Sequence, residues 1–156
     1  MIDIIQYVSD VLVSTNEAWA LPLCASVMSE AIQTFARIKS VNDTRFDQDN
    51  SSILINSSIK FLQVMMTTMK DKSEMLQKRL EKLEVIRKLY DVIIYAIQEH
   101  PENLTALFSD ERFFDVLRFY LLNSEYEYEQ RQTYFSIIDL CERCDRLEGA
   151  QQISPT

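Results

Sequence analysis

Glycine occurs only once in this chain of 156 residues, at Gly149, and proline occurs three times. Phosphate-binding loops and dinucleotide-binding turns need glycine, because their backbone approaches the ligand closely and often adopts positive φ. The scarcity of glycine therefore excludes a P-loop and a Rossmann-type fingerprint. It also leaves few breaks in the chain, so the sequence favours helices joined by short polar turns, and no strand is expected.

The charge balance is acidic, with 24 Asp and Glu against 16 Lys and Arg and a formal net charge of −8. Affinity for nucleic acids and anionic membranes comes mainly from neutralising phosphates, so the composition argues against both as ligands. The longest uninterrupted apolar run, residues 92–97, is far shorter than the about 20 residues that span a bilayer.

The N-terminus carries Asp3 and Asp10 where an export signal would have a basic region and an unbroken apolar stretch. The three cysteines are an odd number and do not indicate a disulfide framework. Together these features predict a cytoplasmic or nuclear protein. Residues 150–156 are expected to form a flexible tail or the start of a linker.

Apolar residues recur every three or four positions, which predicts an all-α fold of about six to seven helices in a single domain over residues 1–149. Pro22 predicts a kink or a fresh start in the second helix. The polar segment 40–50 is expected to be the main mobile loop. The expected helices cover residues 2–13, 17–38, 53–69, 74–99, 102–108 and 111–122, followed by a long last helix that ends at Gly149 as its C-cap.

Serine and aspartate side chains mark several of these helix starts, because they accept hydrogen bonds from free backbone N–H groups. Ser51 or Ser52 is expected to cap the third helix, and Ser73 the fourth. Ser109 or Asp110 is expected to cap the sixth.

The fourth helix changes character along its length. In its first half, charged residues surround a narrow apolar stripe, which predicts solvent on most sides. Residues 85–97 are apolar over most of the circumference, which predicts the central helix of the fold. A coiled coil over residues 76–97 is the competing interpretation.

The order of elements from residue 89 to residue 144 is informative. A long helix, a His100-Pro-Glu-Asn turn, a short helix, a medium helix and a second long helix follow one another. This stretch resembles an armadillo repeat: residues 112–125 look like its second helix and exit, and residues 130–141 look like its third helix. The match covers about one repeat of a period of about 40 to 47 residues. The resemblance implies an armadillo/HEAT-like right-handed stack, whose exposed third helices hold peptides or partner domains.

In nuclear-import adaptors of this family, third helices present a Trp and, four residues later, an Asn to a basic peptide. The matching positions here are Phe135 and Asp139 in the last helix, and Val92 and Ala96 in the preceding long helix. The Trp/Asn pattern is therefore absent, and the resemblance does not imply recognition of nuclear-localisation signals. Acidic residues on the last helix still favour a basic partner surface: Asp139, Glu142 and Asp145.

Cys141 and Cys144 form a C-x-x-C pair, but two cysteines do not complete a zinc site. They lie near a helix C-terminus, where the dipole opposes thiolate formation, so buried reduced cysteines are the favoured interpretation. His100 is the single histidine and is expected to cap a helix end. The sequence therefore predicts no enzyme activity, no metal and no cofactor.

Two further patterns have a structural and a functional interpretation. The methionines at 65, 66, 69 and 75 are typical of a core, although methionines also form adaptable binding surfaces. Residues 125–129, Glu-Tyr-Glu-Tyr-Glu, are expected to form the acidic first turn of the last helix, with tyrosine packed on the preceding helix. A tyrosine-phosphorylation or basic-peptide site is the alternative.

The sequence thus predicts a non-enzymatic scaffold or adaptor domain, inside a larger assembly, that presents its last helix to a partner protein or peptide. The alternative is a homodimerising helical or coiled-coil module closed through residues 2–12 or 76–97. A third hypothesis is an enzyme or enzyme regulator that uses His100 or Cys144. The candidate partner-binding residues are Arg131, Tyr134, Asp139, Glu142, Arg143 and Arg146.

Overall fold

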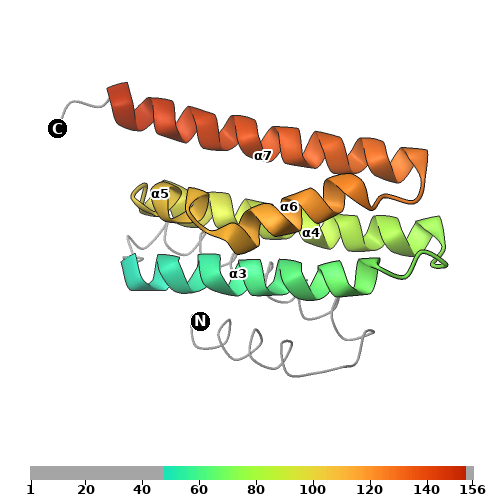
Figure 1. The fold of residues 1–156 in the computed structure, drawn as a ribbon. Coiled ribbons are helices and arrows are strands. Elements are labelled where there is room, and N and C mark those ends of the chain that lie inside the picture. The colour runs from blue at the N-terminus through green and yellow to red at the C-terminus, as the bar shows by residue number, and fades with distance from the viewer. Residues whose placement is uncertain (1–47, 154–156) are drawn as a thin grey trace, which may run out of the picture.

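The computed structural model describes residues 48–153, which are almost entirely helical (Figure 1). No strand occurs within these residues, so the described part of the chain is all-α, as predicted. The helices expected over residues 2–13 and 17–38, and most of the expected loop 40–50, lie outside the described residues. The helices are α3 (Gln48–Met69), α4 (Leu76–Glu99), α5 (Asn103–Phe108), α6 (Glu111–Leu122) and α7 (Glu127–Ile153).

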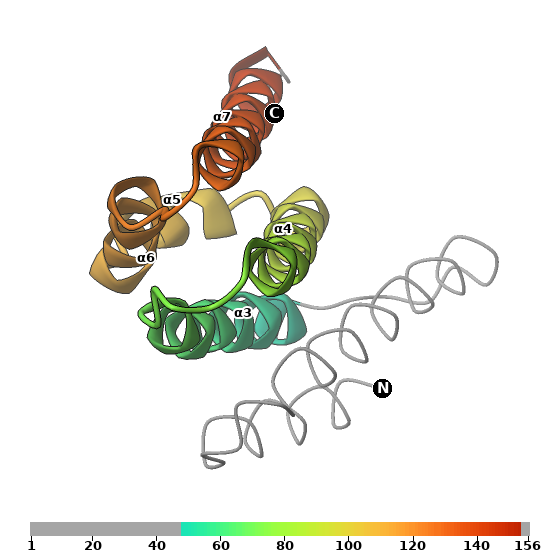
Figure 2. The same cartoon turned by 90° about the vertical axis from the view of Figure 1, so that its right-hand side faces the viewer.

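α3 and α4 each pack against three of the other described helices. α3 and α4 form an antiparallel pair, and α7 lies along α4 on the outside of the described helices (Figure 1; Figure 2). α5 turns the chain, and α6 then runs beside α3 toward the start of α7. α4 packs against α3, α5 and α7, so its apolar second half is covered on more than one side, as predicted.

The second half of α4 is buried because its apolar residues face neighbours on more than one side. Leu89, Ile93 and Ile97 have no exposed surface. The apolar side chains of residues 85–97 are therefore used inside the fold and are not free to pair with a second chain as a coiled coil. The same core includes, from α3, Leu54, Ile59, Leu62, Met65 and Met69.

The start of α4 differs from the prediction. Ser73 does not cap the helix, because its backbone N–H and its hydroxyl both donate to Oδ1 of Asp71, at 3.0 and 2.6 Å. An aspartate side chain commonly binds the backbone two residues further on, and here that turn captures the serine. The helix begins at Leu76 without a side-chain cap.

Two other helix boundaries were predicted wrongly. α3 already includes Gln48, so Ser51 and Ser52 lie inside the helix and residues 48–50 are not part of a loop. α7 continues through Gly149 to residue 153, so this glycine is not a C-cap and the expected tail does not begin at residue 150. A single glycine costs a helix only about 1 kcal/mol relative to alanine, and the Ala-Gln-Gln that follows favours continuation.

α6 begins where the sequence predicted. Oδ1 of Asp110 accepts a hydrogen bond from the backbone N–H of Arg112 at 3.0 Å, which caps the helix. The Arg112 guanidinium also lies 2.7 Å from Asp110 and holds the pKa of that carboxyl below its usual value. On the buried side, the Tyr120 hydroxyl donates to the backbone carbonyl of Leu62 at 2.7 Å. This bond ties α6 to α3 inside the core.

Candidate functional site

α7 has one buried face and one exposed face, and the candidate site is the exposed face. The opposite side of α7 packs on α4 and α6. On the exposed side, Phe135 retains 65% of its surface and Ile138 retains 53%. No described helix covers this side (Figure 2). The buried positions of α7 recur at helical spacing: Glu129, Thr133, Ile137, Leu140 and Cys144.

The structure separates the partner-binding residues predicted from the sequence into two groups. Arg143 is half-buried, and its guanidinium lies 2.5 Å from Asp91 of α4 and 3.7 Å from Asp139. Arg143 therefore helps to hold α7 on α4 and is turned away from the exposed face. The other candidates are exposed on α7: Arg131, Tyr134, Asp139, Glu142 and Arg146.

Exposed apolar side chains on the same face were not among the predicted candidates. Tyr128 is 48% exposed, and it lines up with Phe135 and Ile138 because residues seven and ten positions apart share a side of a helix. The spacing shows that these residues share one side of the helix. It does not show whether that side is exposed or covered by another helix. We call the set Tyr128, Arg131, Phe135, Ile138, Glu142 and Asp145 the outer stripe.

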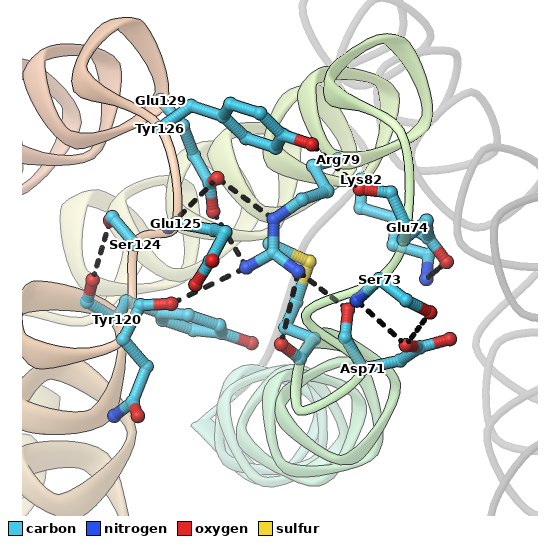
Figure 3. Close-up of polar contacts among 12 residues, drawn as sticks. Asp71, Ser73, Glu74, Arg79, Lys82, Tyr120, Ser124, Glu125, Tyr126 and Glu129 are labelled. Carbon is cyan, nitrogen blue, oxygen red and sulfur yellow. Dashed lines mark hydrogen bonds and ion pairs between the residues drawn. The ribbon is translucent and has the colours of Figure 1, made fainter.

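A buried ion pair fixes the first turn of α7 on α4 (Figure 3). The side chains of Arg79 and Glu129 are 0% and 1% exposed. Nε of Arg79 donates to Oε2 of Glu129 and Nη2 donates to Oε1, both at 2.8 Å, in a bidentate arrangement. The hydrogen bonds to Glu129 raise the pKa of Arg79. The expectation that the first half of α4 is solvated on most sides is therefore wrong at Arg79.

The remaining N–H groups of Arg79 bind backbone carbonyls. Nη1 donates to the carbonyls of Met69 and Asp71, at 3.3 and 2.8 Å, and Nη2 also donates to that of Asn123 at 3.3 Å. Every N–H of the guanidinium thus has an acceptor, which offsets the cost of burying a charge. These carbonyls belong to the end of α3, the turn after it and the end of α6. One side chain therefore links three segments to the start of α7.

Residues 125–129 form the start of α7 only in part as predicted. The Tyr126 hydroxyl donates to the backbone carbonyl of Glu74 at 3.3 Å, so it reaches the turn before α4 rather than the preceding helix α6. The guanidinium of Arg131 lies over the ring of Tyr128, 5.8 Å from its centroid. Glu129, expected only as part of the acidic first turn, is the buried partner of Arg79. Glu129 lies four residues before Thr133 and eight before Ile137, which are both buried, so helical spacing could have identified it as a buried position.

The two cysteines of α7 differ in environment. Cys144 is 3% exposed, and burial raises the pKa of its thiol to about 11. Cys141 is exposed, and both are free thiols. The expectation of buried reduced cysteines is therefore confirmed for Cys144. For Cys141 it is wrong, because that free thiol is exposed.

The other chemically notable residues occupy structural positions. His100 is the C-cap residue of α4, where its backbone N–H donates to the carbonyl of Ala96 at 3.2 Å, as its place at a helix end predicted. Met65 is buried, whereas Met75 is 70% exposed in the turn before α4. Across residues 48–153, no group of three His, Cys, Asp or Glu side chains is arranged to hold a metal ion.

The positions that the armadillo resemblance assigns to peptide contact are accessible in one helix only. Val92 and Ala96 of α4 are 3% and 0% exposed. Phe135 and Asp139 of α7 are both exposed. Among these positions, only those on α7 can touch a partner.

Comparisons with known proteins found no matching family model, no matching curated protein and no matching solved structure. In the part of the chain that the structure describes, no helix is long and apolar enough to cross a membrane. The geometry of α7 therefore carries the functional argument.

Proposed function

We propose that this chain is a non-enzymatic protein-interaction module, a scaffold or adaptor that holds a partner protein or peptide against the outer stripe of α7. The observation that carries the proposal is the exposure of Phe135 and Ile138, 65% and 53%, in the middle of the stripe. Charged residues lie on both sides of this centre. An apolar centre with a polar rim is the usual anatomy of a protein interface.

The composition of the outer stripe also fits a binding surface. Tyrosine and arginine are enriched among the residues that dominate binding energies, and the stripe contains Tyr128 and Arg131. Glu142 and Asp145 add negative charge at its far end, which favours a partner with a basic surface there.

The contacts that hold α7 against α4 support the same proposal. Arg79 binds its first turn, and Arg143 ties its middle to Asp91 of α4. A binding face on a fixed helix loses little conformational freedom when a partner docks, so less of the interaction energy is spent on ordering.

The armadillo/HEAT-like stack of about six to seven helices remains part of this proposal. It is supported by the order of a long α4, a short α5, a medium α6 and a long α7. In such a stack α7 takes the place of a third helix, and third helices line the binding surface of these proteins. We place the module in the cytoplasm or nucleus.

The test is quantitative affinity capture from native extract. The wild-type chain is compared with the double variant Phe135→Ser/Ile138→Ser and with the control Phe114→Ser, which changes an apolar residue of α6 that is 42% exposed. Loss of two central contacts of more than about 1 kcal/mol each lowers recovery of the partner at least about tenfold. The control captures as the wild type does, and all three keep the same helical circular dichroism. Equal recovery of every captured protein by the double variant contradicts the proposal.

A further inference from the structure

The residues of the outer stripe follow the spacing of a helix that pairs with another helix. Positions 128, 131, 135, 138, 142 and 145 are separated alternately by three and four residues, and all of them are exposed. This is the a/d pattern of a heptad repeat. Tyr128 lines a pocket with Leu80 and Leu83 of α4. The described helices otherwise use the opposite face of α7, so the rest of the pattern has no partner among them.

The charges of the stripe are arranged with opposite signs about its apolar centre. Arg131 lies four residues before Phe135, and Glu142 lies four residues after Ile138. A parallel pair of identical helices would place Arg131 against Arg131 and Glu142 against Glu142, and such like-charge contacts are repulsive. An antiparallel pair instead places the arginine of each helix against the glutamate of the other.

We propose that a second copy of this chain occupies the outer stripe, in an antiparallel α7–α7 pair about a twofold axis between residues 136 and 137. In this register Phe135 of each copy faces Ile138 of the other, and Arg131 faces Glu142. Since the contacts are related by a twofold axis, each of them occurs twice. The inference rests on the same premise as the proposed function, the exposed outer stripe of α7, and names a second copy of the chain as its occupant.

The outermost layer of this register is also compatible with pairing. Tyr128 of one copy lies opposite Asp145 of the other, where a phenol can donate to a carboxylate. α3, α4, α5 and α6 all lie on the other side of α7, so they leave the approach of a second α7 open (Figure 2). With few apolar layers, the pair is a small interface, and association is expected to depend on concentration.

Sedimentation equilibrium of the full chain tests the register. We expect the wild type to shift from monomer to dimer as concentration rises, and Arg131→Glu or Glu142→Arg alone to weaken self-association at least about tenfold. In an equal mixture of the two variants, the mixed dimer has opposite charges at both contacts, so dimerisation returns. Arg118→Glu is the matched control: it reverses an arginine on α6 that is 69% exposed, and it associates as the wild type does.

A control measurement of the fold keeps the outcomes interpretable. Circular dichroism of each variant confirms the fold, and the substituted side chains at 131 and 142 are exposed, so reversal leaves the core intact. A wild type that stays monomeric, single variants that dimerise fully, or a mixture that stays monomeric each overturns the proposal.

The failures of the two proposals are distinguishable. A monomeric chain whose capture of another protein depends on Phe135 and Ile138 overturns self-pairing and leaves the adaptor function in place. A dimer restored by the charge mixture, with capture unaffected by Phe135→Ser/Ile138→Ser, supports self-pairing and overturns the adaptor function.

Discussion

Each half of α4 contains a fully buried side chain, but the two are held by different chemistry. Arg79 in the first half and Ile93 in the second half are both 0% exposed. Ile93 is surrounded by apolar side chains, whereas Arg79 is enclosed by Glu129 and by backbone carbonyls. Complete burial of a helical residue can therefore depend on the local apolar pattern or on polar partners far away in the chain.

The two kinds of burial differ in how they respond to substitution. Burial of an apolar side chain stabilises the folded state by about 1.5–3 kcal/mol, and this stabilisation does not depend on one particular partner residue. A buried ion pair is close to neutral against an apolar pair of the same volume, because the cost of desolvation offsets the attraction. Removing one member, however, leaves the other charge buried without its counter-charge.

The largest effect is expected from breaking the buried ion pair. Glu129→Leu leaves the Arg79 guanidinium uncompensated and is expected to lower the free energy of unfolding by about 3–5 kcal/mol. The combined variant Arg79→Met/Glu129→Leu is expected to recover most of this loss. Denaturant unfolding measures both, with Glu127→Leu, an exposed residue of the same turn, as the control. A combined variant no more stable than Glu129→Leu contradicts this view of the first half of α4.

A smaller loss is expected in the apolar half. Ile93→Ala removes buried methyl groups and leaves a cavity, so the free energy of unfolding falls by about 3 kcal/mol. Ile138→Ala makes the same change at a residue that is 53% exposed and shifts it by less than about 0.5 kcal/mol. The same denaturant titration measures both variants, and equal losses would remove the distinction between core and outer stripe.

A loss smaller than that of Ile93→Ala is expected at a partly exposed pair of the same chemistry as Arg79 and Glu129, formed by Asp110 and Arg112. Asp110→Ala removes the cap of α6 and is expected to cost about 1 kcal/mol at neutral pH. Because the pKa of Asp110 is lowered in the folded protein, its stabilisation is present above the unfolded pKa of about 3.9 and is lost as pH falls through the folded value. Thermal unfolding of variant and wild type should therefore converge in acid. A constant difference down to the lowest pH would assign the effect to something other than the carboxylate.

The same comparison explains how far the sequence predicted the fold. The apolar second half of α4 and the cap of α6 depend on neighbours within one or two turns. Pattern rules therefore predicted the first, and capping rules narrowed the second to Ser109 or Asp110. The end of α7 was missed because a glycine is tolerated inside a helix. The start of α4 was missed because Asp71 and Ser73 bind each other.

The candidate site was predicted only in outline. The last helix and most of its exposed charges follow from the sequence. Arg143 was wrongly expected on the exposed face, because its partner Asp91 of α4 lies 52 positions away in the sequence and local pattern cannot reveal the contact. Tyr128 and Ile138 were missed because their exposure depends on which side of α7 meets α4. Such orientation is a property of tertiary packing and is not encoded in the spacing of one helix.

The contact between Arg79 and Glu129 also has a consequence for the order in which the chain folds. It joins residues 50 positions apart, whereas two of its carbonyl acceptors, Met69 and Asp71, lie 10 and 8 positions from Arg79. Loop closure costs more for the longer loop, by about 0.6 kcal/mol for each doubling of its length. The α3–α4 hairpin can therefore form first and position the guanidinium of Arg79 before Glu129 binds to it. Among the described helices, we therefore expect α7, which carries the outer stripe, to dock last and to detach first.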